Sequence, residues 1–228
     1  MAEDQTDLTS AGEGSARKPL SSFLRSVLES QHWPLSWDAR HRFGFLHRLD
    51  VPSSGLVVAA KTYQAFFDLQ LQLSTGLMVR DYVVLCHGWL PRQRRQIDAP
   101  LGWDAKDRTA LSAVCFVRGK PSRTAIRALT RALGASSGEA FTLVSVQIAT
   151  GRRHQIRSHL AHIGHPTVCD ARYSSQATAD ADVSWTPRNF LHRRRLVFKD
   201  SAGIQQEVTE PLPDDLVTAF ARLRPLGT

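Results

Sequence analysis

The spacing of apolar residues along the chain predicts a series of short helices and strands. Leu20, Phe23, Leu24 and Val27 recur with the period of an amphipathic helix over residues 20–28. Residues 141–148 alternate between apolar and polar side chains, which is typical of a strand with one buried face. By the same criteria we expect helices over residues 63–73, 154–163 and 214–223, and strands over residues 56–60, 80–87, 111–117, 123–130 and 191–198.

The order of these elements predicts the fold class. Strands and helices are interspersed without regular βαβ alternation, so we predict an α+β fold with a mixed, mostly antiparallel sheet and flanking helices. Residues 91–108 contain both signs of charge and several turn formers, so we expect mostly loop there, and we expect residues 174–187 to form an irregular polar insertion. Residues 1–18 are polar and poor in large apolar side chains, so we expect them to be disordered and residues 19–228 to form one domain.

Charge and cysteine content narrow the possible functions. The formal net charge is +8 and the pI is near 10.0, which favours a polyanionic partner, nucleic acid before membrane, although many basic proteins bind no polyanion. Cys86, Cys115 and Cys169 are scattered, which argues against a disulfide framework and a cysteine zinc site. No apolar run reaches the roughly 18 residues of a membrane span, and the first residues lack a signal-peptide core. We therefore expect an intracellular protein whose compartment the sequence leaves open.

Asp50 lies in the motif HRLD at residues 47–50, which is followed after Val51 by a Pro-Ser-Ser-Gly turn at residues 52–55. A carboxylate beside cations stays ionised, which suits a nucleophile or a base, and loops held by a sheet commonly carry catalytic groups. The same residues also fit an ordinary Arg48–Asp50 ion pair at a turn.

A second motif, TGRRHQIR at residues 150–157, places three arginines and a histidine at a predicted strand-to-helix junction. Guanidinium groups and the N–H groups of a helix N-terminus together favour an anion. That anion is either a phosphate or the carboxylate of Asp50. A solvated basic helix start is the alternative that composition alone leaves open.

Both motifs resemble signatures of the RluA family of RNA pseudouridine synthases. Residues 47–55, HRLDVPSSG, are similar to the family's HRLDxxTSG signature, with Ser53 in place of the usual threonine. Residues 150–173, TGRRHQIRSHLAHIGHPTVCDARY, are similar to its TGRxHQIRxHLAxxGHPxxxDxxY block. The similarity spans roughly residues 45–217, so the resemblance implies a pseudouridine synthase-like catalytic domain within residues 19–228.

The resemblance also implies roles for individual residues. Asp50 falls on the family's catalytic aspartate, Arg157 on the arginine that pairs with it, and Tyr82 on the tyrosine that stacks on the target base. Arg80 stands where the family usually has a lysine, which keeps the charge but not the geometry. We expect substrate or RNA contacts from His47, Arg48, Arg152, His154 and Gln155.

The implied activity is the isomerisation of uridine to pseudouridine in structured RNA, either ribosomal or transfer RNA. This reaction requires no metal or other cofactor, and we expect the protein to act as a monomer. The run Arg193-Arg194-Arg195 is a candidate for phosphate binding and is equally compatible with a solvated edge strand.

Two rival functions fit parts of the sequence. His154, His159, His162 and His165 suggest a zinc site, but their spacing matches no HExxH motif and the resemblance accounts for three of them without metal. An RNA-binding protein of the same fold that has lost catalysis is the other rival. The strand with which the family usually begins has no counterpart before residue 19, which predicts an uncovered sheet edge.

Overall fold

The computed structural model describes residues 19–104, 110–135 and 137–226, which fall into two compact units. The smaller unit contains the residues up to Arg48, Val57–Met78 and Phe198–Gln206, and the larger unit contains Leu49–Leu56, Val79–Val197 and the residues from Glu207 onward. The predictions of a disordered segment at residues 1–18 and of a missing first strand concern residues outside the described part of the chain. Within that part, no helix is long and apolar enough to cross a membrane.

The smaller unit is helical, with its own apolar core. It contains α1 (Leu20–Val27), two short 3-10 turns (Pro34–Trp37 and Ala39–Gly44) and α2 (Tyr63–Thr75). The side chain of Thr62 caps α2 by accepting a hydrogen bond from Ala65 N, and Gly76 ends it in the left-handed conformation. The core side chains are Leu35, Leu46, Ala60, Phe66, Leu69 and Met78.

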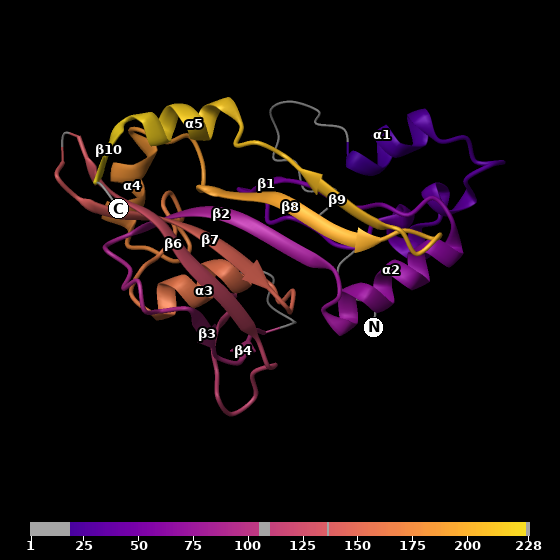
Figure 1. Ribbon diagram of the computed structural model, residues 1–228, viewed down its shortest axis with the longest axis horizontal. Helices are drawn as coiled ribbons and strands as arrows, with labels where there is room; N and C mark the ends of the chain where they lie inside the picture. Colours follow the sequence, from indigo (N-terminus) through magenta and orange to yellow (C-terminus); the bar gives the residue numbers. More distant parts are fainter. Residues whose placement is uncertain (1–18, 105–109, 136, 227–228) are drawn as a thin grey trace. The chain divides into compact units, whose positions relative to one another are not determined.

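A mixed sheet forms the centre of the larger unit (Figure 1). Its strand order is β1-β8-β2-β7-β6-β10, while β3 also pairs with β6 and β9 with β8. The β1–β8 pair is parallel, and the β2–β7, β2–β8, β6–β7, β3–β6 and β6–β10 pairs are antiparallel. The strands are β1 (Ser54–Gly55), β2 (Val79–His87), β3 (Gln96–Asp98), β6 (Arg123–Gly134), β7 (Ala140–Ile148), β8 (Leu191–Lys199), β9 (Gln205–Thr209) and β10 (Leu223–Leu226), with β4 (Leu101–Gly102) and β5 (Ala113–Val114) in a separate pair.

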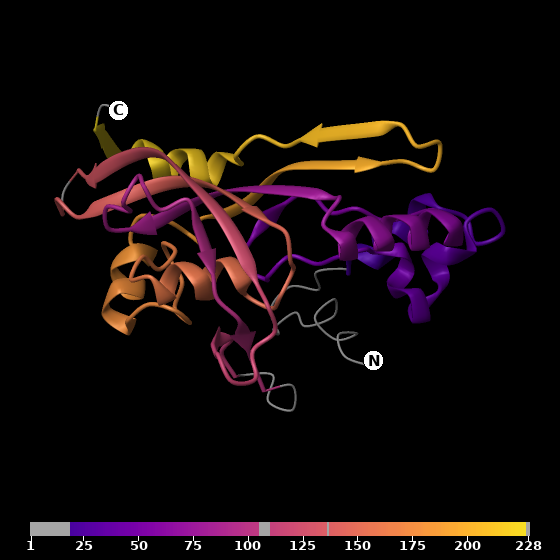
Figure 2. The same ribbon diagram turned by 60° about the horizontal axis from the view of Figure 1, so that its bottom comes forward.

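Helices cover both faces of this sheet (Figures 1 and 2). Successive side chains of a strand point to opposite faces, so Tyr82, Val84 and Cys86 of β2 pack with α3 (Gln155–His162). Val83 and Leu85 pack on the other face with α5 (Asp214–Ala221). The predicted α+β class, with a mostly antiparallel sheet and flanking helices, is confirmed.

Three predicted elements were wrong in part. Residues 56–60 form no strand beyond an isolated bridge between Phe45 and Ala59, and Val58 and Ala60 pack in the core of the smaller unit rather than in a ladder. Only residues 113–114 of the strand predicted over 111–117 are extended and paired. The segment expected to be irregular at 174–187 contains α4 (Gln176–Val183), which lacks an apolar stripe but begins with a Ser175 cap on Thr178 N.

Candidate active site

The turn that carries Asp50 is fixed against strand β8. Ser53 N donates to the carbonyl of Asp50 at 2.8 Å, and the Ser54 hydroxyl lies 2.9 Å from His192 Nδ1. Gly55 pairs with Arg193 at a φ of 116°, and a Cβ there would collide with the backbone of Arg193. Glycine is therefore required for this close approach, which sets where Asp50 can lie.

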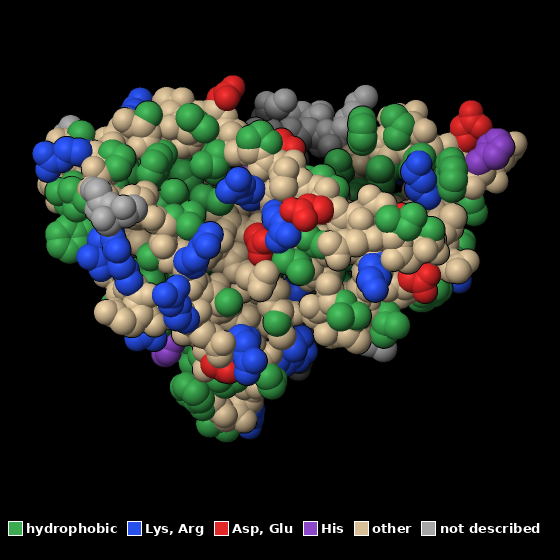
Figure 3. Space-filling view, viewed as in Figure 1, with side chains coloured by type: hydrophobic (Ala, Val, Ile, Leu, Met, Phe, Trp, Pro, Cys, Tyr) green, Lys and Arg blue, Asp and Glu red, His purple; other side chains and the backbone are tan. Residues whose placement is uncertain are grey.

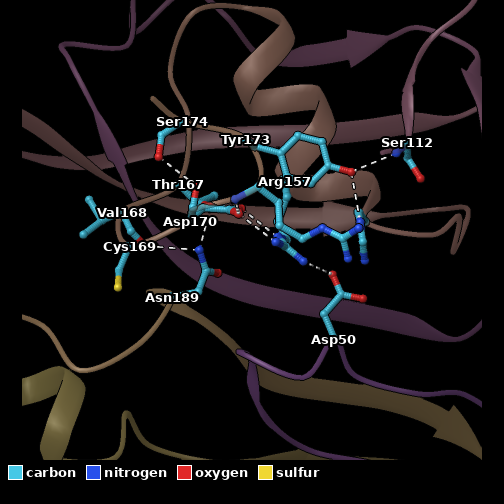
Figure 4. A network of polar contacts seen from close by, with 12 residues as sticks. Asp50, Ser112, Arg157, Thr167, Val168, Cys169, Asp170, Tyr173, Ser174 and Asn189 are labelled. Atoms are coloured by element: carbon cyan, nitrogen blue, oxygen red, sulfur yellow. Dashed lines mark hydrogen bonds and ion pairs between the residues drawn. The ribbon is translucent and has the colours of Figure 1, made fainter. Parts of the chain in front are cut away.

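Arg157, on the first turn of α3, lies between two carboxylates (Figure 4). Its Nε and Nη2 donate to Asp170 at 2.7 and 2.6 Å, whereas its Nη1 donates to Asp50 at 3.3 Å. The Arg157 and Asp170 side chains are 3% and 0% exposed, and Asp50 is 17% exposed. Arg157 is thus anchored on Asp170 and presents its remaining nitrogen to a more accessible Asp50.

Asp170 is itself held by neighbouring donors. The Thr167 hydroxyl donates to its Oδ2 at 2.9 Å, and Arg172 N donates to its Oδ1 at 3.2 Å. Asn189 Nδ2 in turn donates to Thr167 Oγ1 at 2.8 Å. Burial would lower the pKa of Arg157, but its hydrogen bonds to Asp170 and the charges of Asp170 and Asp50 raise that pKa overall.

His154 precedes α3 in a left-handed conformation, with a φ of 50°. Its Nδ1 lies 2.9 Å from the Tyr173 hydroxyl, which accepts a hydrogen bond from Ser112 N at 3.0 Å, and Arg157 lies over the Tyr173 ring. Burial lowers the pKa of His154 to about 4; Arg157 and other nearby arginines act in the same direction, and Asp50 opposes them. The imidazole is therefore neutral at pH 7. Its Nδ1 can accept a hydrogen bond from the Tyr173 hydroxyl, and Nε2 then carries the ring hydrogen.

Tyr82 lies on β2, and its hydroxyl is held by strand β8. Arg193 donates to the hydroxyl oxygen from both Nε at 2.9 Å and Nη2 at 2.6 Å, and its Nη1 donates to Leu56 O at 2.9 Å. Arg193 thereby joins Tyr82 to the segment that follows the Asp50 turn. Arg80, two residues before Tyr82, is buried and donates to the carbonyls of Ile148 and Ala149.

Gln155 and Arg152 occupy the loop before α3. The Gln155 side-chain oxygen accepts from the Thr150 hydroxyl and from Arg152 N, and its nitrogen donates to Arg123 O and to Thr124 Oγ1. These contacts use its full hydrogen-bonding capacity, so this buried amide supports the loop from within. The half-buried Arg152 reaches Pro121 O only at 3.4 Å.

His47 and Arg48 belong to the smaller unit. His47 is buried, and its Nε2 accepts a hydrogen bond from Val58 N at 3.3 Å. Arg48 is half-buried. The ring of His47 therefore supports the local backbone, and RNA contacts by these two residues stay a prediction.

The arginine run on β8 is not a solvated edge strand, and phosphate binding by this run stays a prediction. Arg193 is buried against Tyr82, and Arg195 pairs with Asp81 and Glu207, each at 2.7 Å. Strand β8 is paired on both sides, so it is not an edge strand. Of the three arginines only Arg194 is exposed, because alternate residues of a strand point to opposite faces and its two neighbours point inward or toward carboxylates.

Of the two histidines of α3, His162 is exposed and His159 is held by hydrogen bonds within the protein. His159 lies 2.8 Å from the Thr124 hydroxyl through Nδ1 and 2.9 Å from Ala99 O through Nε2. Residues 19–104, 110–135 and 137–226 contain no group of three or more His, Cys, Asp or Glu side chains arranged to hold a metal ion.

Sequence reasoning missed the anchoring partners of the site. Asp170 and Tyr173 lie at signature positions of the 150–173 block and could have been singled out from it. The role of Arg193 had no such signal, because in sequence it is one member of a basic run.

A family model described as RNA pseudouridylate synthase matches residues 16–162, which include Asp50, Tyr82 and Arg157. The chain belongs to this family. It is 39% identical over 190 residues to a protein of Nitrosomonas europaea named ribosomal large subunit pseudouridine synthase D, covering 81% of this chain and 52% of that protein. It is 37% identical over 153 residues to the dual-specificity RNA pseudouridine synthase RluA of Vibrio parahaemolyticus, covering 67% of this chain and 59% of that protein. The resemblance to the RluA family is thereby confirmed.

The fold of this family member also matches a solved relative. The structure of human RNA pseudouridylate synthase domain containing 1 superposes with a TM-score of 0.67 at 26% identity, over 80% of this chain and 74% of the human chain. The chain spans little more than half the length of the two curated bacterial relatives described above.

Proposed function

We propose that this chain isomerises uridine to pseudouridine in RNA and that Asp50 is its catalytic nucleophile or base. The observation that carries the proposal is the Asp50 carboxylate facing Arg157 Nη1 at 3.3 Å, in a chain that belongs to the RNA pseudouridylate synthase family. All three members of the Asp50–Arg157–Asp170 network come from one chain. A monomer would therefore suffice for this chemistry.

The reaction breaks the C1′–N1 bond of the nucleotide, rotates the uracil and rejoins it through C5, from which a proton leaves. Asp50 either attacks C1′ or removes a ribose proton to give a glycal, and both roles require an ionised carboxylate. Arg157 donates to the Asp50 carboxylate through Nη1 and would hold it in position. Because Asp170 binds Arg157 more tightly than Asp50 does, the Asp50 carboxylate stays available to the substrate.

Tyr82, His154 and Arg152 would bind and orient the nucleotide. The target uridine must leave the stack to reach Asp50, and the Tyr82 ring, fixed through Arg193, offers a rigid surface for the freed base. Neutral His154 would offer an Nε2–H donor beside Asp50, while Arg152 would offer charge to phosphates. We propose structured ribosomal or transfer RNA as the substrate and no cofactor.

The test is release of tritium from RNA labelled at C5 of uridine, because the new C5 bond expels that hydrogen. Wild type should release label, and Asp50→Asn should lower the rate by on the order of 1000-fold or more, as loss of a catalytic group does. Asp68→Asn, at an exposed position of α2, is the matched control and should release label like the wild type.

Binding separates this proposal from its rival. If wild type binds the RNA and releases no label, the chain is an RNA-binding protein without this activity. Equal release by wild type and Asp50→Asn would instead exclude Asp50 as the catalytic carboxylate.

A further inference from the structure

Four arginines line a hollow of the larger unit that has no part in the site described above. The hollow has a volume of about 330 Å³ and is lined by Arg92, Arg95 and residues 127–131, which include Arg127 and Arg131. Lys and Arg side chains gather over strand β6 in the space-filling view (Figure 3). The four guanidinium groups would place a strong positive potential inside one small volume.

The hollow lies where strand β6 is irregular and its edge is open. Leu129 is an extra residue in β6, because Ala128 pairs with Val144 and Thr130 with Leu143. Strand β3 pairs with residues 123–125 and β10 with residues 131–134, so no strand in the described part of the chain pairs with residues 127–130 on that edge.

These arginines have no acidic partner among the described residues. The side chains of Arg92, Arg95 and Arg127 are exposed and form no hydrogen bond or ion pair there. Arg131 lies over the Trp89 ring and donates to Leu90 O at 3.4 Å, while its buried Nε has no partner. By contrast Arg123, at the start of the same strand, pairs with Asp98. The like charges around the hollow repel one another, and an anion would relieve that repulsion.

The position of the hollow indicates which anion fits. Gln155, at the start of the helix that carries Arg157, is bonded to Arg123 O at one end of β6. Arg127 lies four residues further along, about 13 Å at the usual rise of a strand. Successive phosphates of a nucleic-acid strand are much closer than that, about 3.4 Å along the axis of a duplex. Tyr82 pairs with Val146 and Val146 with Ile126, so the side chain of the neighbouring Arg127 points to the face of the sheet opposite Tyr82. A phosphate in the hollow would therefore belong to a part of the RNA that continues past the edge of β6, outside the target nucleotide.

We propose that this arginine pocket, formed by Arg92, Arg95, Arg127 and Arg131, binds backbone phosphates of the substrate RNA outside the target nucleotide. The inference rests on the proposed function for the identity of the RNA. Its chemistry, a phosphate held by several guanidinium groups, rests on the pocket alone.

Two triple variants test the pocket. The pocket variant Arg92→Gln/Arg95→Gln/Arg127→Gln leaves the packed Arg131 in place. The control variant Arg94→Gln/Arg222→Gln/Arg224→Gln removes the same number of charges from exposed positions that do not line the pocket. None of these six side chains has a hydrogen-bond or ion-pair partner among the described residues, so both variants should fold.

The measurement is the affinity for a stem-loop RNA as a function of salt, which counts phosphate contacts without requiring turnover. The logarithm of the binding constant falls linearly with the logarithm of the salt concentration, and each lost phosphate contact makes this slope less steep by about 0.7–0.9. In the pocket variant the slope should be less steep by about two, and the RNA should bind on the order of 10-fold more weakly at low salt. The control variant should have a slope and an affinity near those of the wild type. An unchanged slope in the pocket variant, or equal losses in both variants, would overturn the proposal.

Inorganic pyrophosphate distinguishes RNA from a small phosphate compound. Calorimetric binding of pyrophosphate that the pocket variant loses, together with equal RNA slopes in both variants, would identify a small-molecule site and overturn the RNA assignment. Failure of the tritium assay does not affect this test. A chain that releases no label but loses slope only in the pocket variant supports the pocket and contradicts the proposed isomerisation.

Discussion

Two clusters of charge in the larger unit differ in whether their charges are paired within the protein. Around Arg157 the guanidinium and the carboxylates are matched at 2.6–3.3 Å, with Thr167 and Arg172 N completing the shell of Asp170. In the arginine pocket four cations share one hollow without a carboxylate among the described residues. Paired buried charges fix a geometry, whereas unpaired cations at an open edge leave binding capacity for a ligand. This contrast leads to four predictions about stability.

The largest expected effect is at Asp170. Asp170→Asn leaves the buried Arg157 without its main partner and should lower the free energy of unfolding by about 3 kcal/mol, measured by urea denaturation. Asp98→Asn breaks the exposed pair with Arg123 and is the matched control, with an expected loss below about 1 kcal/mol. Equal losses would mean that burial does not distinguish the two pairs.

The next effect concerns His154 and acid. The pKa of His154 is lowered to about 4 in the folded protein, against 6.5 for the free group, so only the unfolded state takes up the proton between these values. Above pH 6.5 His154 is neutral in both the folded and the unfolded state, and the free energy of unfolding is unaffected by its titration. As the pH falls toward 4, the free energy of unfolding decreases by on the order of 2 kcal/mol.

His154→Asn tests this, because asparagine tolerates the left-handed backbone at this position. Urea unfolding at pH values above and within the window should show a shallower loss for this variant than for the wild type. His162→Asn, at an exposed position of α3, is the control. If the free energy of unfolding fell equally with pH in His154→Asn and the wild type, the lowered pKa of His154 would be contradicted.

A smaller effect is expected where Tyr82 meets Arg193. Tyr82→Phe removes the oxygen that accepts two hydrogen bonds from a buried guanidinium, and we expect a loss of about 1.5 kcal/mol in the free energy of unfolding. Tyr63→Phe also removes a hydroxyl, from an exposed contact with Asp38, and should cost less. A larger loss at Tyr63 would show that Arg193 finds another acceptor.

The smallest effect is expected in the arginine pocket. The variant Arg92→Gln/Arg95→Gln/Arg127→Gln breaks no pair among the described residues, so the free energy of unfolding should change by less than about 0.5 kcal/mol. Thermal and urea unfolding without RNA give the answer. A marked loss would mean that these arginines stabilise the fold, and the contrast between the two clusters would then disappear.

The sequence predicted elements best where local pattern and tertiary packing agree. Strand β7 alternates as a half-buried strand should, and α2 carries both a cap and a terminal glycine. Residues 56–60 have the apolar content of a strand, but Val58 and Ala60 pack in the core of the smaller unit instead of in a ladder. Helix α4 was missed because its cap is its main local signal.

The candidate site shows the same division. Motif resemblance paired Asp50 with Arg157, and the structure brings these two residues together. The stronger contact of Arg157 is with Asp170, and neither composition nor helical period measures the relative strength of two contacts. Arg193 was hidden for a related reason, since a run of three arginines in sequence does not say which one is turned inward.

Among the described residues, the edge of β6 between β3 and β10 is unpaired, which has a consequence for solubility during folding. An unpaired strand edge is a template on which another chain can add a strand, and such additions lead to aggregates. A second copy approaching residues 127–130 would bring its own arginines against these, and the bulge at Leu129 would break the ladder between them. Bound RNA would neutralise the repulsion between the arginines of two copies, but it would also cover the edge. The edge would therefore be protected from strand addition both with and without RNA.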